Sequence, residues 1–271
     1  MEQLRGKVAV VTGAGSGIGR ALVAKLTAEE MRVVAADVEG EALADLSDVS
    51  TFVTDVSNAD DVAALADYAF TAHGAVDVLC NNAGVFCGGL MWERPESDFA
   101  WTLGVNLWGI LHATRAFVPR MIEAGTPGHI VNTVSMAGLC TNAFSGPYTI
   151  SKFAAMAATE CLAYDLAATG APIKVSAVVP GAVKTRIAES DRNRPAHLAA
   201  ERSDDAAFVE QALGDLTFGY GAPPEEVAQL IVDAITTDQF LVPTRPSFED
   251  QLRARFDGLV AKRLPDPAPF D

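Results

Sequence analysis

Short runs of apolar, β-branched residues alternate along this chain with longer segments of helical spacing. The predicted strands cover residues 7–13, 32–37, 51–56, 76–84, 129–135 and 174–181, with 239–243 as a candidate for the last. Between them, apolar residues recur at helical intervals, such as Ile18, Leu22 and Leu26. Strands that are apolar throughout are buried on both faces, so the alternation indicates a parallel sheet covered by helices on both sides. We predict one α/β domain over residues 1–271.

The segment TGAGSGIG, residues 12–19, follows the first predicted strand and opens a helix. Gly13, Gly17 and Gly19 permit positive φ or a close approach of the backbone to a ligand. The amino terminus of the helix offers free N–H groups and partial positive charge to a pyrophosphate. Any tight strand-to-helix turn favours glycine, so the position after a first strand is what indicates a dinucleotide loop rather than a structural turn.

Asp37, at the end of the second predicted strand, bears on the choice of cofactor. A carboxylate there accepts hydrogen bonds from the two ribose hydroxyls of an adenosine and repels a 2′-phosphate. Ser16 stands before Gly17, and Val38 and Glu39 follow Asp37, so no basic residue is close in sequence. This pattern predicts NAD, the alternative being a solvated aspartate at a strand end.

Two further strand ends carry polar residues. Asp55, in TDV (54–56), could meet the adenine amino group, and NNAG (81–84) forms a polar turn after the fourth strand. For Asn81 a second interpretation stays open, in which its amide ties neighbouring strand ends together.

The segment GPYTISK, residues 146–152, places Tyr148 and Lys152 one helical turn apart behind Pro147, which suits the first turn of a helix. A phenol titrates near 10 and must lose roughly three pKa units to act at neutral pH. A neighbouring ammonium and a helix amino terminus can lower the phenol pKa by part of that amount, and the positive ring of an oxidised nicotinamide could provide the remainder. We therefore predict a proton-transferring phenol. Ser135 would hold a substrate oxygen. The alternatives are a half-buried tyrosine, a solvated lysine and a serine that merely ends a strand.

With TGAGSGIG, NNAG, Asn106, Ser135, YTISK and PGAVKT in this order, the chain resembles the short-chain dehydrogenase/reductase family over essentially its full length. The resemblance implies a single-domain, doubly wound Rossmann fold with a seven-stranded parallel sheet, assembled as a homotetramer or homodimer. It implies that Tyr148 is the catalytic acid/base, Lys152 its helper, Ser135 the donor to the substrate oxygen, and Asn106 the support of a proton relay. The cofactor contacts expected from the motifs and the resemblance are Gly13, Ser16, Gly17, Ile18, Gly19, Asp37, Asp55, Val56, Asn82, Ala83, Gly84, Tyr148, Lys152, Pro180, Gly181, Val183 and Thr185.

Composition excludes several classes of function. The formal net charge of −15 argues against partners such as nucleic acid or an anionic membrane surface. The four cysteines lack C-x-x-C spacing, so we expect reduced thiols, most of them buried, and neither disulfides nor a metal site. The amino terminus does not read as a secretory signal, and no apolar run approaches the ~20 residues of a membrane span. We predict a soluble, cytoplasmic protein.

Residues 187–221 form a long connection that we predict to be a lid on the substrate side. Apolar residues expected near that side favour a lipophilic secondary alcohol or ketone; they are Trp92, Met136, Leu139, Phe144, Phe208 and Leu213. Arginines of the connection, Arg186, Arg192 and Arg194, could instead meet a polar substrate. Residues 247–271 read as a helical extension packed on its own or a neighbouring subunit. The predicted function is an NAD-dependent oxidoreductase, and the alternative is a non-catalytic NAD(H) sensor with the same fold.

Overall fold

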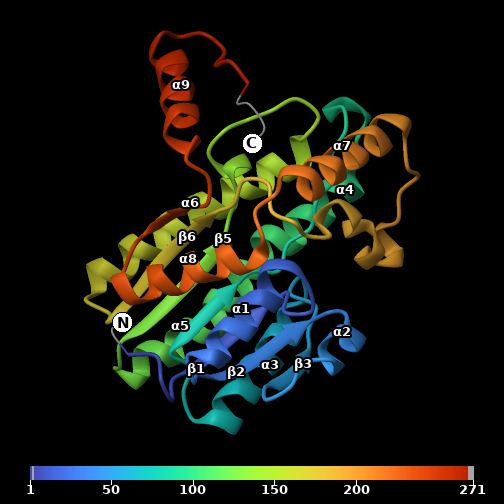
Figure 1. Cartoon of the computed structure of the whole chain (residues 1–271). Helices are drawn as coiled ribbons and strands as arrows, with labels where there is room; N and C mark the ends of the chain where they lie inside the picture. The colour runs from blue at the N-terminus through green and yellow to red at the C-terminus, as the bar shows by residue number, and fades with distance from the viewer. Residues whose placement is uncertain (2, 268–271) are drawn as a thin grey trace.

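The structure is a computed structural model that describes residue 1 and residues 3–267. Its seven strands form one parallel sheet in the order β3-β2-β1-β4-β5-β6-β7 (Figure 1). The strands are β1 (Val8–Thr12), β2 (Arg32–Asp37), β3 (Ser50–Val53), β4 (Val78–Asn81), β5 (Gly128–Thr133), β6 (Ile173–Val179) and β7 (Leu241–Pro243). The predicted doubly wound, seven-stranded α/β fold is confirmed.

Helices cover both faces of the sheet. They are α1 (Gly17–Ala28), α2 (Gly40–Ala44), α3 (Ala59–His73), α4 (Glu96–Leu103), α5 (Gly109–Ala124), α6 (Gly146–Thr169), α7 (Asp204–Tyr220), α8 (Pro224–Thr237) and α9 (Phe248–Val260). Short turns are η1 (Met91–Glu93), the π-helical η2 (Gly104–Trp108), η3 (Met136–Gly138), η4 (Ile187–Asn193) and η5 (Ala196–Leu198). One apolar core joins the sheet to α1 and α8, and a second joins it to α3, α5 and α6.

Amphipathic spacing explains how the helices attach to the sheet. In α3 the buried residues are Val62, Leu65, Ala66 and Ala69, the stripe that helical periodicity predicts. The Asn58 side chain caps the start of this helix by accepting a hydrogen bond from the Asp60 N–H at 2.9 Å. The helix ends at Gly74, which adopts the left-handed conformation that glycine tolerates best.

Several predicted strands are longer than the observed ones at the carboxyl end. Residues 54–56 after β3, 82–84 after β4, 134–135 after β5 and 180–181 after β6 leave the sheet as loops. All of these loops meet at one edge of the sheet, where the strand order reverses between β1 and β4. In doubly wound sheets the crevice at this reversal is where ligands bind.

The carboxy-terminal helix α9 stands away from the sheet (Figure 1). Its apolar residues Phe256 and Leu259 are 56% and 46% exposed. Gln251 of this helix is buried, and the guanidinium of Arg255 lies 5.0 Å from the Phe153 ring centroid. Within the described residues, no helix is long and apolar enough to cross a membrane.

Candidate active site

A cavity of about 310 Å³ opens at the carboxyl edge of the sheet. Sixteen of the seventeen residues expected to contact the cofactor line it, and so do Ser135, Met136 and Leu213. The remaining one, Gly19, is buried behind the wall, as is Asn106. The sequence motifs, although far apart along the chain, therefore meet around a single hollow.

The glycine turn after β1 is shaped by close backbone contacts. Gly13 has a φ of +65°, and a Cβ there would lie 2.8 Å from the Cα of Ala83. Gly17 has a φ of +52°, and a Cβ there would lie 2.8 Å from the Thr185 side chain. At Gly19 a Cβ would lie 2.0 Å from the carbonyl oxygen of Gly13. Gly19 thus lets α1 begin directly against the turn, which is a packing role rather than the ligand contact we expected.

Asp37 is held at the cavity wall by two backbone donors. Its Oδ2 accepts a hydrogen bond from the Gly15 N–H at 2.8 Å, and its Oδ1 accepts one from the Glu39 N–H at 2.9 Å. These bonds orient the carboxylate, because rotation about its side chain would break one of them. Each oxygen keeps acceptor capacity for a ligand hydroxyl.

No basic residue is close to Asp37 in sequence, but the fold brings the distant Arg192 to this region. The Arg192 Nε donates to Glu39 Oε1 at 2.9 Å, and the Asn193 side chain donates to the same oxygen at 2.7 Å. These partners lower the pKa of Glu39 against the opposing effect of burial. The guanidinium lies beside the site, but its charge is matched by Glu39. The contact spans more than a hundred residues of sequence, and no local pattern indicates it.

Tyr148 lies in the first turn of α6, directly after Pro147. The Ser135 hydroxyl lies close enough to the phenol to lower the pKa of the phenol, and the Tyr148 ring packs against Phe86 with centroids 5.0 Å apart. The Ser135 Oγ also accepts a hydrogen bond from the Ala137 N–H at 3.1 Å, which fixes its position at the start of η3. The two hydroxyls therefore stand side by side on the cavity wall.

Lys152 lies one turn beyond Tyr148 and is only 3% exposed, so it is not a solvated helix lysine. Its Nζ donates to the Thr133 carbonyl at 2.9 Å and lies 5.8 Å from the centre of the Tyr148 ring. Burial lowers the pKa of Lys152 to about 8. The ammonium has two further N–H donors, which point to a role in holding polar ligand groups.

The expected lowering of the Tyr148 pKa is not found in the protein chain alone. Burial raises the pKa of the phenol, and the hydrogen bond to Ser135 lowers it by less. The expectation rested on the ammonium, the helix terminus and a bound nicotinamide ring, and left out the loss of hydration. Burial disfavours the charged phenolate, so it raises the pKa of the phenol.

Asn106 occupies the π-helical turn η2 between α4 and α5. Its Nδ2 donates to the Val85 carbonyl and to Ser151 Oγ, each at 2.9 Å, and its Oδ1 accepts from the Val85 N–H at 2.9 Å. A Cβ on Gly84 would lie 3.4 Å from Asn106 Oδ1 and 3.5 Å from Lys152 Nζ. Gly84 therefore leaves the space between the amide and the ammonium open.

The polar turn after β4 mainly ties strands together. Asn81 Nδ2 donates to Asn132 Oδ1 at 2.8 Å, which supports the structural interpretation of Asn81. Asn82 donates to the Thr12 carbonyl at 3.1 Å and accepts from Thr133 Oγ1 at 3.2 Å, while also lining the cavity. Asp55 lines the cavity too, with Oδ1 accepting hydrogen bonds from the N–H and Oγ of Ser57.

The substrate side of the cavity differs in part from expectation. Met136 and Leu213 line it, whereas Trp92 and Phe208 are 78% and 68% exposed and Leu139 packs in a separate small core. Residues that local patterns did not single out also contribute to the lining: Phe86, Val134, Asn142, Pro195, Leu216 and Gln251. Gln251 comes from α9, so the carboxy-terminal extension reaches the site.

The cysteines and acidic residues form no metal site among the residues that the structure describes. Cys80, Cys87 and Cys140 are buried free thiols, and Cys161 is exposed, in agreement with the expectation that most are buried.

A doubly wound parallel sheet with a paired tyrosine and serine, a buried lysine and a glycine-turn cavity defines an oxidoreductase of the Rossmann type. The sequence pattern described as short chain dehydrogenase matches residues 7–196. The chain belongs to the short-chain dehydrogenase family.

Known relatives align over almost the whole chain. A 1-deoxy-11-beta-hydroxypentalenate dehydrogenase of Streptomyces avermitilis is 35% identical, across 94% of this chain and 90% of that protein. A CLA biosynthesis dehydrogenase/reductase of Lactiplantibacillus plantarum is 27% identical, across 98% and 97%. The crystal structure of a short chain dehydrogenase/reductase from Burkholderia phymatum in complex with NAD is 38% identical and superimposes with a TM-score of 0.96, covering 99% of this chain and 100% of that one.

Proposed function

We propose that this enzyme uses NAD to interconvert a lipophilic secondary alcohol and its ketone by hydride transfer, with Tyr148 as the general acid/base. One observation carries the proposal. The hydroxyls of Tyr148 and Ser135, the buried ammonium of Lys152 and the oriented carboxylate of Asp37 all line one cavity. The two hydroxyls could act on the oxygen of an alcohol, and the carboxylate could bind the ribose of a dinucleotide. Their presence in one cavity suits the oxidation of an alcohol by a dinucleotide cofactor.

The two ends of the cavity suit the two halves of a dinucleotide. Gly13 and Gly17 line the cavity beside the amino terminus of α1, where a pyrophosphate would be best bound. Asp37 would hold the adenosine ribose, and Lys152, Val183 and Thr185 would hold the nicotinamide half. The bound cofactor would accept or supply the hydride.

The protein's own part is the proton and the substrate oxygen. Ser135 would donate a hydrogen bond to that oxygen as negative charge develops on it. Tyr148 would take the proton from its hydroxyl during oxidation and return it during reduction. Lys152 would favour the phenolate, and Gly84 lies between the ammonium and the Asn106 amide. Together these groups would form the expected proton relay.

Support for the substrate class comes from the lining and from a relative. Val134, Met136, Leu213 and Leu216 give the substrate side an apolar wall. The Streptomyces avermitilis relative is named for the dehydrogenation of 1-deoxy-11-beta-hydroxypentalenate. We therefore place the substrate among hydroxylated, largely hydrocarbon molecules.

The test is a panel of secondary alcohols, including cyclohexanol, 2-octanol and borneol, assayed for NADH formation with NAD⁺ and with NADP⁺. We expect turnover of at least one alcohol with a preference for NAD⁺. Tyr148→Phe should lower turnover by about 10²–10⁴-fold while the Kd for NADH stays within about threefold. Tyr164→Phe, at an exposed tyrosine of the same helix, is the matched control. An active Tyr148→Phe variant would refute the role of the phenol, and NADH binding without any turnover would favour the sensor.

A further inference from the structure

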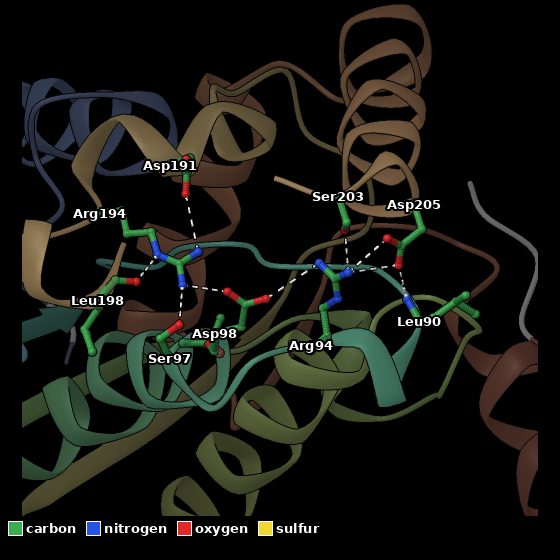
Figure 2. Close-up of polar contacts among 10 residues, drawn as sticks. Leu90, Arg94, Ser97, Asp98, Asp191, Arg194, Leu198, Ser203 and Asp205 are labelled. Atoms are coloured by element: carbon green, nitrogen blue, oxygen red, sulfur yellow. Dashed lines mark hydrogen bonds and ion pairs between the residues drawn. The ribbon is translucent and has the colours of Figure 1, made fainter. Parts of the chain in front are cut away.

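Two buried arginines connect the segment over the cavity to the body of the protein (Figure 2). We call residues 187–220 the roof, because η4 and α7 contribute Ile187, Ser190, Leu213, Leu216 and Thr217 to the cavity lining. The side chains of Arg94 and Arg194 are 3% and 9% exposed. Buried charges of this kind require partners, and the hydrogen-bond and ion-pair partners that the structure shows lie on the roof or on residues 90–98. The Arg194 guanidinium also lies 5.0 Å from the Trp101 ring centroid.

The first link holds the amino-terminal part of the roof. Arg194 Nη2 donates to Asp98 Oδ1 at 2.6 Å and to Ser97 Oγ at 3.3 Å, both at the start of α4. Its Nε donates to the Leu198 carbonyl at 2.7 Å, and its Nη1 lies 3.5 Å from the carboxylate of Asp191. One guanidinium therefore fixes the turn 191–198 and anchors it to α4.

The second link holds the start of α7. Arg94 Nη2 donates to Ser203 Oγ at 2.5 Å and to the two Asp205 oxygens at 2.9 and 3.1 Å. Asp205 Oδ2 also accepts a hydrogen bond from the Leu90 N–H at 2.7 Å. Both ends of the exposed connection 195–202 are thus attached to one short stretch of the body.

Asp98 joins the two links. Its Oδ1 accepts a hydrogen bond from Arg194, its Oδ2 lies 3.7 Å from Arg94 Nη1, and its carboxylate is near enough to the Cys87 thiol to help raise the pKa of that thiol. The carboxylate is 3% exposed, so water cannot replace it as a partner of the two cations.

A path of contacts runs from this network to the proposed acid/base. Ser190, in the same turn as Asp191, accepts a hydrogen bond from the Phe86 N–H at 3.0 Å. Phe86 in turn packs on the Tyr148 ring. A roof displaced by loss of the network would therefore change the substrate end of the cavity before the cofactor end.

We propose that Asp98 is a positioning residue that holds the roof over the substrate side of the cavity by pairing with Arg94 and Arg194. The kinetic part of this inference rests on the proposed function, and the structural part does not. Asp98 does not line the cavity, so it would act through Arg194, Ser190 and the roof rather than by touching substrate.

The decisive variant is Asp98→Asn, which keeps the shape of the side chain and removes its charge. We expect trypsin to cut after the exposed Arg202 at least fivefold faster than in the parent. With NAD⁺ and the best alcohol of the panel, KM for the alcohol should rise at least tenfold, while kcat and the Kd for NADH change less than threefold. Asp98→Glu, which restores the charge, should recover part of the loss.

Asp191→Asn is the matched control, because it removes a carboxylate from the same guanidinium on its exposed side, where Asp191 is 62% accessible. It should behave like the parent in both assays. Should Asp98→Asn fail to fold, Asp205→Asn tests the second link through a partly exposed residue and should give the same pattern.

Three outcomes would overturn the proposal: parental rates of cleavage with an unchanged KM, equal effects of Asp191→Asn and Asp98→Asn, or a loss of NADH affinity as large as the rise in KM. If the parent oxidises no alcohol at all, the proposed function fails, and the proteolysis comparison still decides the role of Asp98.

Discussion

Lys152 combines a positive charge with almost complete burial. Its one protein hydrogen bond that the structure shows runs to the Thr133 carbonyl, and burial lowers its pKa to about 8. An ammonium without an anion close by is destabilising in such a place. A site that tolerates it is suited to ligands that bring hydroxyl or phosphate oxygens of their own, and this agrees with the proposed cofactor.

The pH dependence of NADH binding tests this assignment. The ammonium is present below pH 8 and is lost as pH rises through about 8, so affinity should fall on the alkaline side. Hydrogen bonds to charged groups contribute about 1.5–3 kcal/mol, so losing the ammonium should lower NADH affinity by about tenfold or more. Fluorescence titration with NADH between pH 6.5 and 9.5 measures this affinity. Lys152→Met should bind NADH weakly at every pH, whereas Tyr148→Phe should retain the alkaline decline in affinity. If NADH affinity in Lys152→Met depended on pH as it does in the parent, Lys152 would not be the group that binds the cofactor.

At the scale of elements, the junction between β1 and α1 has the strictest steric requirement. The helix begins so close to the turn that the position of Gly19 has no room for a methyl group beside the Gly13 carbonyl. The turn also contacts Ala83 after β4, so the two strand ends at the reversal of strand order are packed together there.

Gly19→Ala should therefore damage both folding and cofactor binding. We expect a destabilisation at or above the about 1–3 kcal/mol of ordinary overpacking, together with a loss of NADH affinity of at least tenfold. Gly74→Ala is the comparison: its φ of +79° makes the substitution unfavourable by about 1–2 kcal/mol, but a Cβ there meets no described atom within 4 Å. Chemical denaturation and NADH titration of both variants provide the measurement. Equal effects on NADH affinity would refute the steric argument.

Local patterns predicted the elements well because strands and helices have periodicities that extend over a few residues. The glycine turn, Asp37, Ser135 and the Tyr148–Lys152 pair were all identified in this way, and the structure brings them to one cavity. The features that local patterns left unpredicted have a common physical cause. Salt bridges such as Arg192 with Glu39, the approach of Gln251 to the cavity, and the pKa of a buried phenol depend on contacts between distant segments, which leave no periodic signal.

At the scale of the whole molecule, β5 connects two buried ionisable groups at opposite ends of the sheet. Its last residue, Thr133, holds Lys152, and its second residue is His129, which is fully buried. The Ser176 hydroxyl donates to the Gln239 carbonyl at 2.5 Å, so His129 Nε2 must be the donor in its 2.8 Å contact with Ser176. His129 Nδ1 then carries no proton. It lies 3.7 Å from the Asp238 carboxylate and has no hydrogen-bond partner among the described residues.

Acid should destabilise the protein through His129. Burial lowers its pKa to about 4, whereas an unfolded histidine titrates near 6.5. Between these pH values the unfolded chain binds a proton that the folded protein does not. The contribution of His129 to the free energy of unfolding is therefore complete above pH 6.5 and is lost as pH falls toward 4. Over this range the free energy of unfolding falls by about 3 kcal/mol. Urea unfolding of the parent and of His129→Gln from pH 4 to 8 should show a flatter curve for the variant, and the exposed His197→Gln should follow the parent. Parallel curves for the parent and His129→Gln would disprove this.

The Asn106 side-chain amide pairs with the main chain of Val85 as a neighbouring strand would. Its Nδ2 donates a hydrogen bond to the Val85 carbonyl, and its Oδ1 accepts one from the Val85 N–H. A carboxylate at this position, as in Asn106→Asp, would exchange the donating nitrogen for an oxygen. That oxygen would face the Val85 carbonyl oxygen at a place where the side chain is almost fully buried. The exchange of this one atom would thus repel the loop after β4, with almost no change in the shape of the side chain.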